Sequence, residues 1–267
     1  MIYEVNPNKL CVSFAKSIND DFFPEAMAVL SGKNPGWVFV DNPETPNTAA
    51  VYSIGGEGFL MLGNEDNADF NSSLALFIDS EFKIRLASIG FNCVEISGHP
   101  RWNSHIEEVF KYKKLDFCKM FVYRLPDNFP AADKSYSNIV KVNAALLAKN
   151  YSNKKFLTDK IESFWGNMES YLKSGFGYAA VENDIICGLC FSAFIQDDIC
   201  VIDIETVKEY QKRGFGEMSA RQLLQECRKR NLKPHWDCME HNKASRKTAE
   251  KIGLEYKWEY KCYDFYF

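Results

Sequence analysis

The residues Gln211-Lys-Arg-Gly-Phe-Gly216 form a basic turn that carries two glycines. An apolar run from Cys200 to Thr206 precedes this turn, and an amphipathic segment from Gly216 to about Asn231 follows it. At a helix start the backbone N–H groups lack intrahelical partners, and the helix dipole places partial positive charge there. The glycines permit close backbone approach and positive φ, and the neighbouring lysine and arginine add charge. The turn therefore predicts a binding site for a phosphate-containing cofactor.

A second candidate segment is Trp236-Asp-Cys-Met-Glu-His-Asn-Lys-Ala-Ser-Arg-Lys-Thr-Ala-Glu-Lys-Ile-Gly253. It predicts a short strand over 235–239, a helix over 242–252 and a helix end at Gly253. Asn242 is placed to cap that helix, and a cap alone would explain an asparagine at this position. Direct contact between Asn242 and a bound cofactor is the alternative, and the two roles are compatible.

The nine cysteines indicate reduced, buried thiols. They lie singly in apolar runs, apart from the pair Cys187 and Cys190, which falls within one predicted strand. Residues three apart in a strand face opposite sides, and neither a second pair nor a histidine cluster accompanies these two. We therefore expect core packing here, and no metal site.

The elements that position these residues are clearest in the C-terminal half. Strands are predicted over 175–182, 185–195 and 199–206, then a helix over 216–231 that ends before Pro234. The N-terminal half repeats this order loosely, but its loop after Gly63 is acidic and lacks the glycine pair. A phosphate would be repelled there. Residues 126–134, which contain a proline at 126 and at 130, are predicted to link a lobe at 1–125 to a domain at 135–267.

The turn at 211–216 is similar to the pyrophosphate-binding turn of the GNAT superfamily of N-acetyltransferases, in which Gln or Arg is followed, after two residues of any type, by Gly-x-Gly or Gly-x-Ala. The segment 236–253 resembles that superfamily's later Asn-x-x-Ser motif, with Gly-Leu in place of the usual Gly-Phe. The resemblance covers about 135–267. Phe164-Trp-Gly-Asn, Gly175-Phe-Gly-Tyr, Ile204-Glu-Thr and Trp236-Asp-Cys are closer still to the branch that includes the zwittermicin A resistance acetyltransferase.

This resemblance implies an α/β (α+β) fold with a mixed, mostly antiparallel sheet flanked by helices, here pseudo-duplicated as two lobes. It also implies acetyl-CoA as cosubstrate, an amine acceptor and direct transfer without a covalent acyl-enzyme. Two strands would splay after a bulge and receive acetyl-CoA between them. The cofactor-binding residues carried over are Thr206, Val207, Gln211, Lys212, Arg213, Gly214, Phe215, Gly216, Asn242 and Ser245.

Direct transfer requires a base for the ammonium, polarisation of the thioester and stabilisation of the leaving thiolate. Strand alternation puts Asp203 and Glu205 on one face, and Glu205 lies nearest the turn. Glu205 is the candidate base; a structural carboxylate or an anchor for the substrate ammonium is the alternative. Backbone N–H groups around Thr206 and Val207 are expected to polarise the thioester.

The general acid is not assigned by the resemblance, because the position where the superfamily often has a tyrosine is Ala249. Tyr260 is the candidate acid and Tyr256 lies near it, although aromatic packing explains both. His235 and His241 flank the strand at 235–239 without an identified partner. Trp37, Phe59 and Trp102 are candidates for lining an acceptor pocket, with core packing as the alternative.

We expect an N-acetyltransferase that acts on a primary amine of a small molecule, such as an antibiotic or a metabolite. The alternative is a non-catalytic or regulatory protein that binds coenzyme A. The net charge of −4 provides no basic field for nucleic acid and is compatible with a cationic substrate. No apolar run reaches membrane-spanning length, so we expect no membrane partner, a cytoplasmic location, and a monomer or homodimer.

Overall fold

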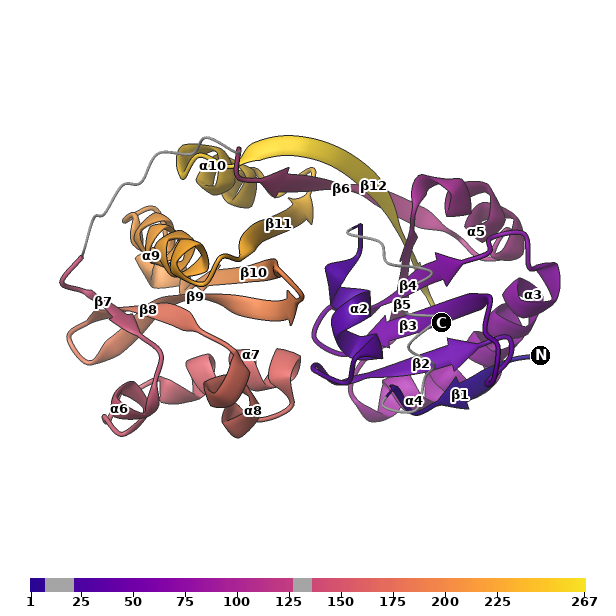
Figure 1. Ribbon diagram of the computed structural model, residues 1–267, viewed down its shortest axis with the longest axis horizontal. Coiled ribbons are helices and arrows are strands. Elements are labelled where there is room, and N and C mark those ends of the chain that lie inside the picture. The colour runs from indigo at the N-terminus through magenta and orange to yellow at the C-terminus, as the bar shows by residue number, and fades with distance from the viewer. Residues whose placement is uncertain (8–21, 127–135) are drawn as a thin grey trace. The chain divides into compact units, whose positions relative to one another are not determined.

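The computed structural model describes residues 1–7, 22–126 and 136–267 (Figure 1). By internal packing the chain forms two compact units, and the first contains Met1–Met120 together with Glu259–Phe267. The second unit contains Phe121–Trp258. The predicted linker at 126–134 lies, except for its first residue, outside the described part of the chain.

The first unit contains one sheet with helices packed against it. Its strands in spatial order are β1-β2-β3-β4-β5-β12, and neighbouring strands are antiparallel except for the parallel pair β4 and β5. Aromatic side chains such as Phe39, Phe59 and Phe82 fill its core, each at most 1% exposed. The elements are β1 Tyr3–Val5, α2 Pro24–Leu30, β2 Gly36–Val40, β3 Thr48–Ser53, β4 Gly58–Gly63, α3 Ala68–Phe77, a π-helical turn Ile78–Phe82, α4 Lys83–Ser88, β5 Cys93–Gly98, a 3₁₀ turn Pro100–Trp102, α5 Asn103–Val109, β6 Asp116–Arg124 and β12 Glu255–Tyr266.

The second unit repeats this arrangement of strands. Its strands in spatial order are β11-β10-β9-β8-β7, antiparallel except for the parallel pair β10 and β11. The elements are β7 Ile139–Lys141, α6 Ala144–Leu147, α7 Lys154–Trp165, α8 Met168–Ser174, β8 Gly177–Glu182, β9 Ile185–Gln196, β10 Ile199–Thr206, a 3₁₀ turn Lys208–Tyr210, α9 Phe215–Lys229, β11 Lys233–Met239 and α10 Lys243–Lys251.

In both units the same order of elements leads up to the parallel pair of strands, which is β4 and β5 in the first unit and β10 and β11 in the second. In the first unit three antiparallel strands, β2 to β4, lead into α3 and then β5. In the second unit three antiparallel strands, β8 to β10, lead into α9 and then β11. The mixed α/β architecture with a mostly antiparallel sheet, predicted from the sequence, is therefore confirmed.

The sheet of the second unit is covered on both faces (Figure 1). Cys190 and Ile202 pack with Leu223 of α9 on one face. On the other face Phe191 packs against Phe164 of α7, with ring centroids 5.5 Å apart. Because successive residues of a strand alternate between faces, the odd-numbered residues 203 and 205 of β10 point to the α7 side and its even-numbered residues to the α9 side.

Two register shifts change this alternation along β9. One lies opposite Val201/Ile202, where the pairing skips Ala193, and the other lies opposite Ala180/Val181, where it skips Cys187. Cys187 packs with Phe215 and Cys190 with Leu223, so both thiols lie on the α9 face. The expectation of opposite faces is therefore wrong, because a bulge at one of the two residues shifts the alternation.

Two strands continue from one unit into the other. β6 passes between them at Met120/Phe121, and β12 passes at Trp258/Glu259. The sequence placed all of 135–267 in one domain, whereas the last nine of these residues pack with the first unit. In that unit Tyr263 and Phe265 of β12 pair with β5 and are each 1% exposed.

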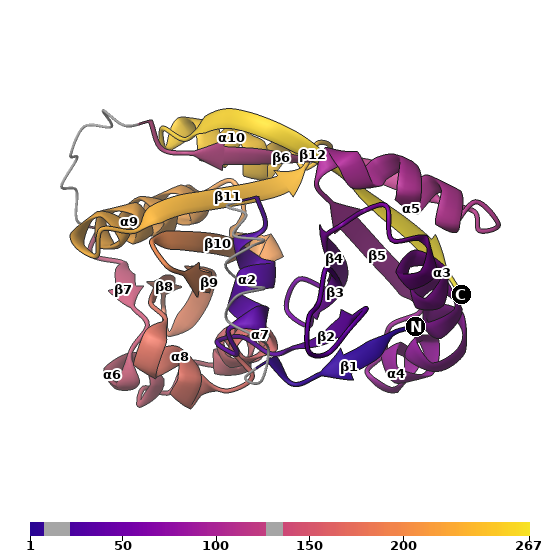
Figure 2. The same ribbon diagram turned by 45° about the vertical axis from the view of Figure 1, so that its right-hand side comes forward.

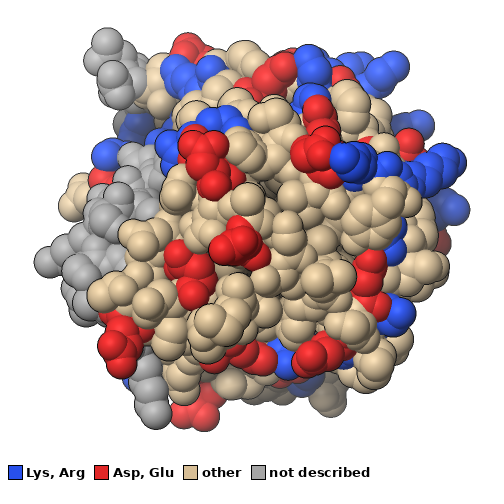
Figure 3. Space-filling model, turned by 90° about the vertical axis from the view of Figure 1, so that its right-hand side faces the viewer, with Lys and Arg blue, Asp and Glu red and all other residues tan. Residues whose placement is uncertain are grey.

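Three further observations concern the helices, the charged surface and metal binding. No helix in the described part of the chain is long and apolar enough to cross a membrane. On the face drawn in Figure 3, acidic and basic side chains are interspersed with uncharged surface. Among the described residues, no group of three or more His, Cys, Asp or Glu could hold a metal ion.

Candidate functional site

Helix α9 begins at an open, uncapped N-terminus. Gly214 is the N-cap in the left-handed conformation, with φ 83° and ψ 0°, and no side chain caps the helix there. A Cβ built on Gly214 would meet nothing within 4 Å. The first intrahelical bond is donated by Met218 N to Gly214 O at 3.0 Å, so the amides of residues 215–217 precede the hydrogen-bonded ladder. This end of the helix suits an anion.

The side chains of the turn hold its shape. Gln211 Nε2 donates to Thr206 O at 3.3 Å and ties the turn to the end of β10. Arg213 donates to both carboxylate oxygens of Glu182, at 2.6 and 2.8 Å, and its guanidinium lies 5.0 Å from the Phe215 ring centroid. Arg213 is thus already paired, and Lys212 is the second cation that the turn offers; its φ is 62°.

Gly216 brings the helix start close to β10. A Cβ there would lie 3.3 Å from Thr206 Oγ1 and 3.4 Å from Ile204 Cδ1. Glu217, in the same first turn, is held by Arg221 at 3.0 Å and by Lys251 of α10. Burial raises the pKa of Glu217, but hydrogen bonds from these two cations outweigh it and the net shift is downward.

The two predicted carboxylates, Asp203 and Glu205, share a face as the alternation required, and that face is the α7 side. Lys160 of α7 reaches both: its Nζ lies 3.4 Å from Asp203 Oδ2 and 3.5 Å from Glu205 Oε2. Burial raises the pKa of Asp203, while the Lys160 cation opposes that rise. No motif in the sequence pointed to Lys160, which lies more than forty residues before the carboxylates.

β10 and β11 separate beyond a short parallel pairing. Ile199–Val201 pair with Lys233–His235, but β10 runs on to Thr206 and β11 to Met239 (Figure 1). The register shift opposite Val201/Ile202 falls where this separation begins. The predicted bulge therefore lies on the neighbouring strand β9. We refer to the β11 side of β10 beyond this pairing as the opening between β10 and β11.

The backbone of Thr206 faces this opening, whereas that of Val207 does not. Val207 N donates to Cys187 O at 2.9 Å, toward β9. Adjacent residues of an antiparallel strand direct their amides to opposite sides, so the Thr206 amide points toward the opening. The Val207 amide, predicted to polarise a thioester, is already used within the fold.

The later motif is organised by α10. Asn242 Oδ1 accepts from Ser245 N at 3.1 Å and caps the helix. Ser245 Oγ accepts from Trp236 Nε1 at 3.0 Å, which joins the helix to β11. The expected cap is present, and Ser245 also has a structural partner.

The tyrosine candidates lie in aromatic clusters. Tyr260 belongs to the first unit, is 6% exposed and packs edge-on against Phe23, with centroids 5.1 Å apart. Tyr256 contacts Phe121 in the same manner, at 5.4 Å. Ala249, where the resemblance would have placed a tyrosine, is fully buried. No described tyrosine is placed beside the carboxylate pair by these contacts.

The equivalent turn of the first unit is closed by side chains. Asn67 caps α3 through Phe70 N at 3.1 Å, and its Nδ2 donates to Asp41 Oδ2 at 3.0 Å. Arg101 Nη2 donates to Gly63 O at 3.2 Å, and the same guanidinium pairs with Glu65 at 3.0 Å. With a side-chain cap and acidic neighbours, this helix start does not fit a phosphate.

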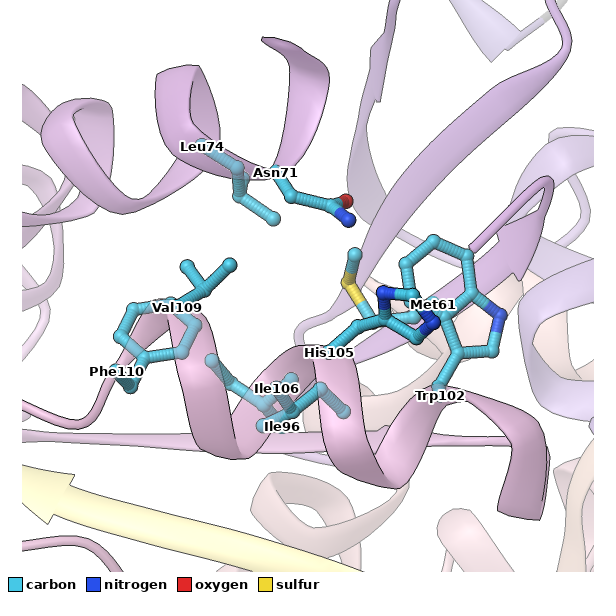
Figure 4. A pocket seen from close by; sticks show the side chains of 9 residues that line it. All are labelled: Met61, Asn71, Leu74, Ile96, Trp102, His105, Ile106, Val109 and Phe110. Carbon is cyan, nitrogen blue, oxygen red and sulfur yellow. The ribbon is translucent and has the colours of Figure 1, made fainter. Parts of the chain in front are cut away.

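A small pocket lies between α3 and α5 in the first unit (Figure 4). Figure 2 shows these two helices. Its interior has space for about one water molecule. Asn71 Oδ1 and Trp102 Nε1 have no hydrogen-bond partner among the described residues. Trp102 thus lines a pocket, whereas Phe59 is in the core and Trp37 packs against it. The lining residues are Met61, Asn71, Leu74, Ile96, Trp102, His105, Ile106, Val109 and Phe110.

The chain is similar in sequence or in fold to several known proteins. A protein of Bacillus subtilis (strain 168), named as the uncharacterized N-acetyltransferase YdfB, is 24% identical over 262 residues, which cover 96% of this chain and 91% of that protein. A GCN5-related N-acetyltransferase-like protein from Streptococcus suis 89/1591 has a TM-score of 0.66 at 20% identity, covering 94% of this chain and 96% of that one. A GCN5-related N-acetyltransferase from Sphaerobacter thermophilus has a TM-score of 0.58 at 8% identity, covering 99% and 95%.

These solved structures share the fold. The family model of the GNAT acetyltransferases matches residues 19–263, which is nearly the whole chain. This chain therefore belongs to the GNAT acetyltransferase family.

Proposed function

We propose that the protein moves an acetyl group from acetyl-CoA to a primary amine of a small molecule. The observation that carries the proposal is the open start of α9, where Gly214 leaves space and no side chain caps the helix. A diphosphate fits this end because it accepts hydrogen bonds from the exposed amides and carries the charge that the helix dipole favours. The cosubstrate supplies an activated acetyl thioester.

The roles of the turn follow from this placement. The amides of 215–217 bind the diphosphate, Lys212 adds charge, and Gln211 and Arg213 keep the turn in shape. Asn242 and Ser245 line the route toward β11 while they organise α10. Phe215 is 4% exposed and anchors the helix start in the core.

The helix start that binds the diphosphate and the carboxylates of Asp203 and Glu205 lie on opposite faces of β10. A cosubstrate held at α9 can present its acetyl group to the α7 face only through the opening between β10 and β11. The Thr206 amide faces this opening and is the donor placed to polarise the thioester carbonyl. Glu205 then meets the acceptor on the far side, where it removes the proton of the ammonium.

A small cationic acceptor, such as an antibiotic or another metabolite, is supported by the carboxylate pair and by the resemblance to the zwittermicin A resistance branch. A cytoplasmic location is supported by the cysteines, since the eight that the structure describes are all free thiols. Tyr260 remains the candidate acid, and its buried aromatic setting makes unassisted departure of the thiolate the simpler route.

The affinity for acetyl-CoA tests whether the start of α9 binds the diphosphate. Gly214→Glu should raise the Kd for acetyl-CoA on the order of 100-fold, because it puts a carboxylate beside the diphosphate. Gly90→Glu is the matched control: Gly90 also has positive φ and an open Cβ position, but belongs to the first unit. Isothermal titration of both variants measures the effect, and equal affinities would refute the site.

Thiol release tests the chemistry. The protein and acetyl-CoA are incubated with a panel of primary amines (an aminoglycoside, a polyamine, an aminosugar and an amino acid amide), with the corresponding alcohols as controls. Transfer should release coenzyme A thiol with at least one amine and give the N-acetyl product by mass spectrometry. Tight acetyl-CoA binding without release would favour a non-catalytic protein that binds coenzyme A.

A further inference from the structure

Lys160 is the positive charge that the fold supplies to the carboxylate pair. It extends from α7, an element that carries no motif, and its Nζ lies within 3.5 Å of an oxygen of each carboxylate. Its side chain is 29% exposed, so the cation is shielded from solvent on most sides. Lys160 thus enters the site from the face on which we place the acceptor.

The two carboxylates differ in their surroundings. The side chain of Asp203 is 24% exposed and that of Glu205 is 47% exposed. Asp203 Oδ2 is buried and accepts no hydrogen bond from the described residues, so the nearby ammonium is what compensates its charge. A buried carboxylate without such a cation is costly, whereas a half-exposed one is hydrated.

The other groups around Asp203 add no positive charge. Glu205 on the same strand and Asp237 on β11 are both acidic and raise its pKa. The thiol of Cys190 on β9 is fully buried, and burial raises its pKa well above the ordinary value. Among the interactions that act on Asp203, Lys160 alone favours the ionised form.

We propose that Lys160 is a positioning residue, which holds Asp203 in a fixed ion pair and thereby leaves Glu205 as the carboxylate that deprotonates the acceptor. This inference rests on the proposed function. In the step, an N–H bond of the acceptor ammonium breaks and its proton goes to Glu205. The nitrogen lone pair then forms the C–N bond, and the C–S bond of the thioester breaks with its electron pair on sulfur. A second N–H bond breaks as the amide forms, and this proton ends on the thiolate to give the free thiol of coenzyme A.

The division of roles predicts a specific pattern of rescue. Lys160→Met leaves Asp203 buried and uncompensated, and should lower kcat/KM about 10- to 100-fold with the best amine of the panel. Lys160→Met combined with Asp203→Asn removes both charges, and should recover kcat/KM to within about 5-fold of wild type. Glu205→Gln should stay inactive in either background.

Two further measurements separate positioning from a general loss of structure. Carbon-13 NMR of labelled aspartate carboxyls, in the protein alone, should show that Lys160→Met raises the pKa of Asp203, while Lys160→Arg leaves it near the wild-type value. Lys155→Met is the matched control: it lies on the same helix, pairs with Asp159 at the surface and should change neither readout.

The outcomes distinguish the inference from the proposed function. If the double variant is no more active than Lys160→Met, or if the Asp203 titration is the same in both proteins, the inference is wrong. If the wild type fails to bind acetyl-CoA or to acetylate any amine, the proposed function is wrong, and the NMR titration still reports on the ion pair.

Discussion

His235 illustrates how a single buried residue links the fold to pH. It lies on β11 and is 1% exposed, and its Nδ1 is 3.2 Å from Arg124 Nη2. Burial, with a smaller contribution from the Arg124 cation, lowers the pKa of the imidazole to about 3. The ring is therefore neutral near neutral pH, and its protonation opposes folding rather than serving as part of the site.

The expected consequence is a loss of stability in acid. Because the folded-state pKa is depressed, the stabilisation is complete above the unfolded pKa of about 6.5 and is lost as pH falls toward 3. From about pH 6.5 to about pH 5 this one group should remove about 2 kcal/mol of unfolding free energy. His235→Gln does not titrate and should lack this loss, as urea unfolding at about pH 7.5 and about pH 5 would measure.

The control for this comparison is His241→Gln, which changes an exposed histidine. It should keep the pH dependence of the wild type. Equal pH dependence in His235→Gln and the wild type would contradict the assignment of the acid-sensitive group.

At the residue scale, the sequence predicts the role of a residue where the residues next to it in the chain determine that role. Glu205 and Asp203 follow from strand alternation near a glycine turn, and Asn242 follows from its place before a helix. Lys160 could not be found in this way, because its partners come from a strand that packs across α7 in space. The Val207 amide donates its hydrogen bond to β9, and this bond could not be predicted because it depends on the pairing of the strands.

At the scale of elements, the caps of α10 and α8 can be compared by substitution. Asn242→Ala removes the cap of α10 and should cost about 1 kcal/mol of unfolding free energy. Asn167 caps α8 in the same way, through Ser170 N at 2.8 Å. Both alanine variants should lose similar stability in denaturant titrations, but only Asn242→Ala should weaken acetyl-CoA binding, by several-fold. If the two variants bind acetyl-CoA equally well, Asn242 acts only as a helix cap.

Elements with strong local signals were predicted closely. The helix expected over 216–231 is observed as Phe215–Lys229, and the strand expected over 199–206 is observed as Ile199–Thr206. α2 was missed, because seven buried residues in a short helix show no amphipathic period. A bulge was expected from the resemblance, but its place on β9 was not predicted, since nothing in an apolar strand marks which residue will lack a partner.

At the scale of the whole molecule, the first unit depends on the C-terminal strand. Deletion of Glu259–Phe267 removes Tyr263 and Phe265 from its core, and each large aromatic contributes several kcal/mol on burial. The truncated chain should lose hydrogen-exchange protection in β4 and β5 but retain it in β9 and β10. Deletion of Tyr266–Phe267 alone, whose side chains are exposed, should leave both units protected.

Because Glu259–Phe267 pack with the first unit, this unit cannot finish folding until the end of β12 has been synthesised. A ribosome finishes 1–120 early, yet the residues that close the hydrophobic interior of this part emerge only after 259–267 have left the exit tunnel. Throughout that interval the edge of β5 lacks its neighbour, so the nascent chain is open to β-pairing with other chains. Chaperone binding to the first half should therefore persist until residues 259–267 have emerged from the exit tunnel.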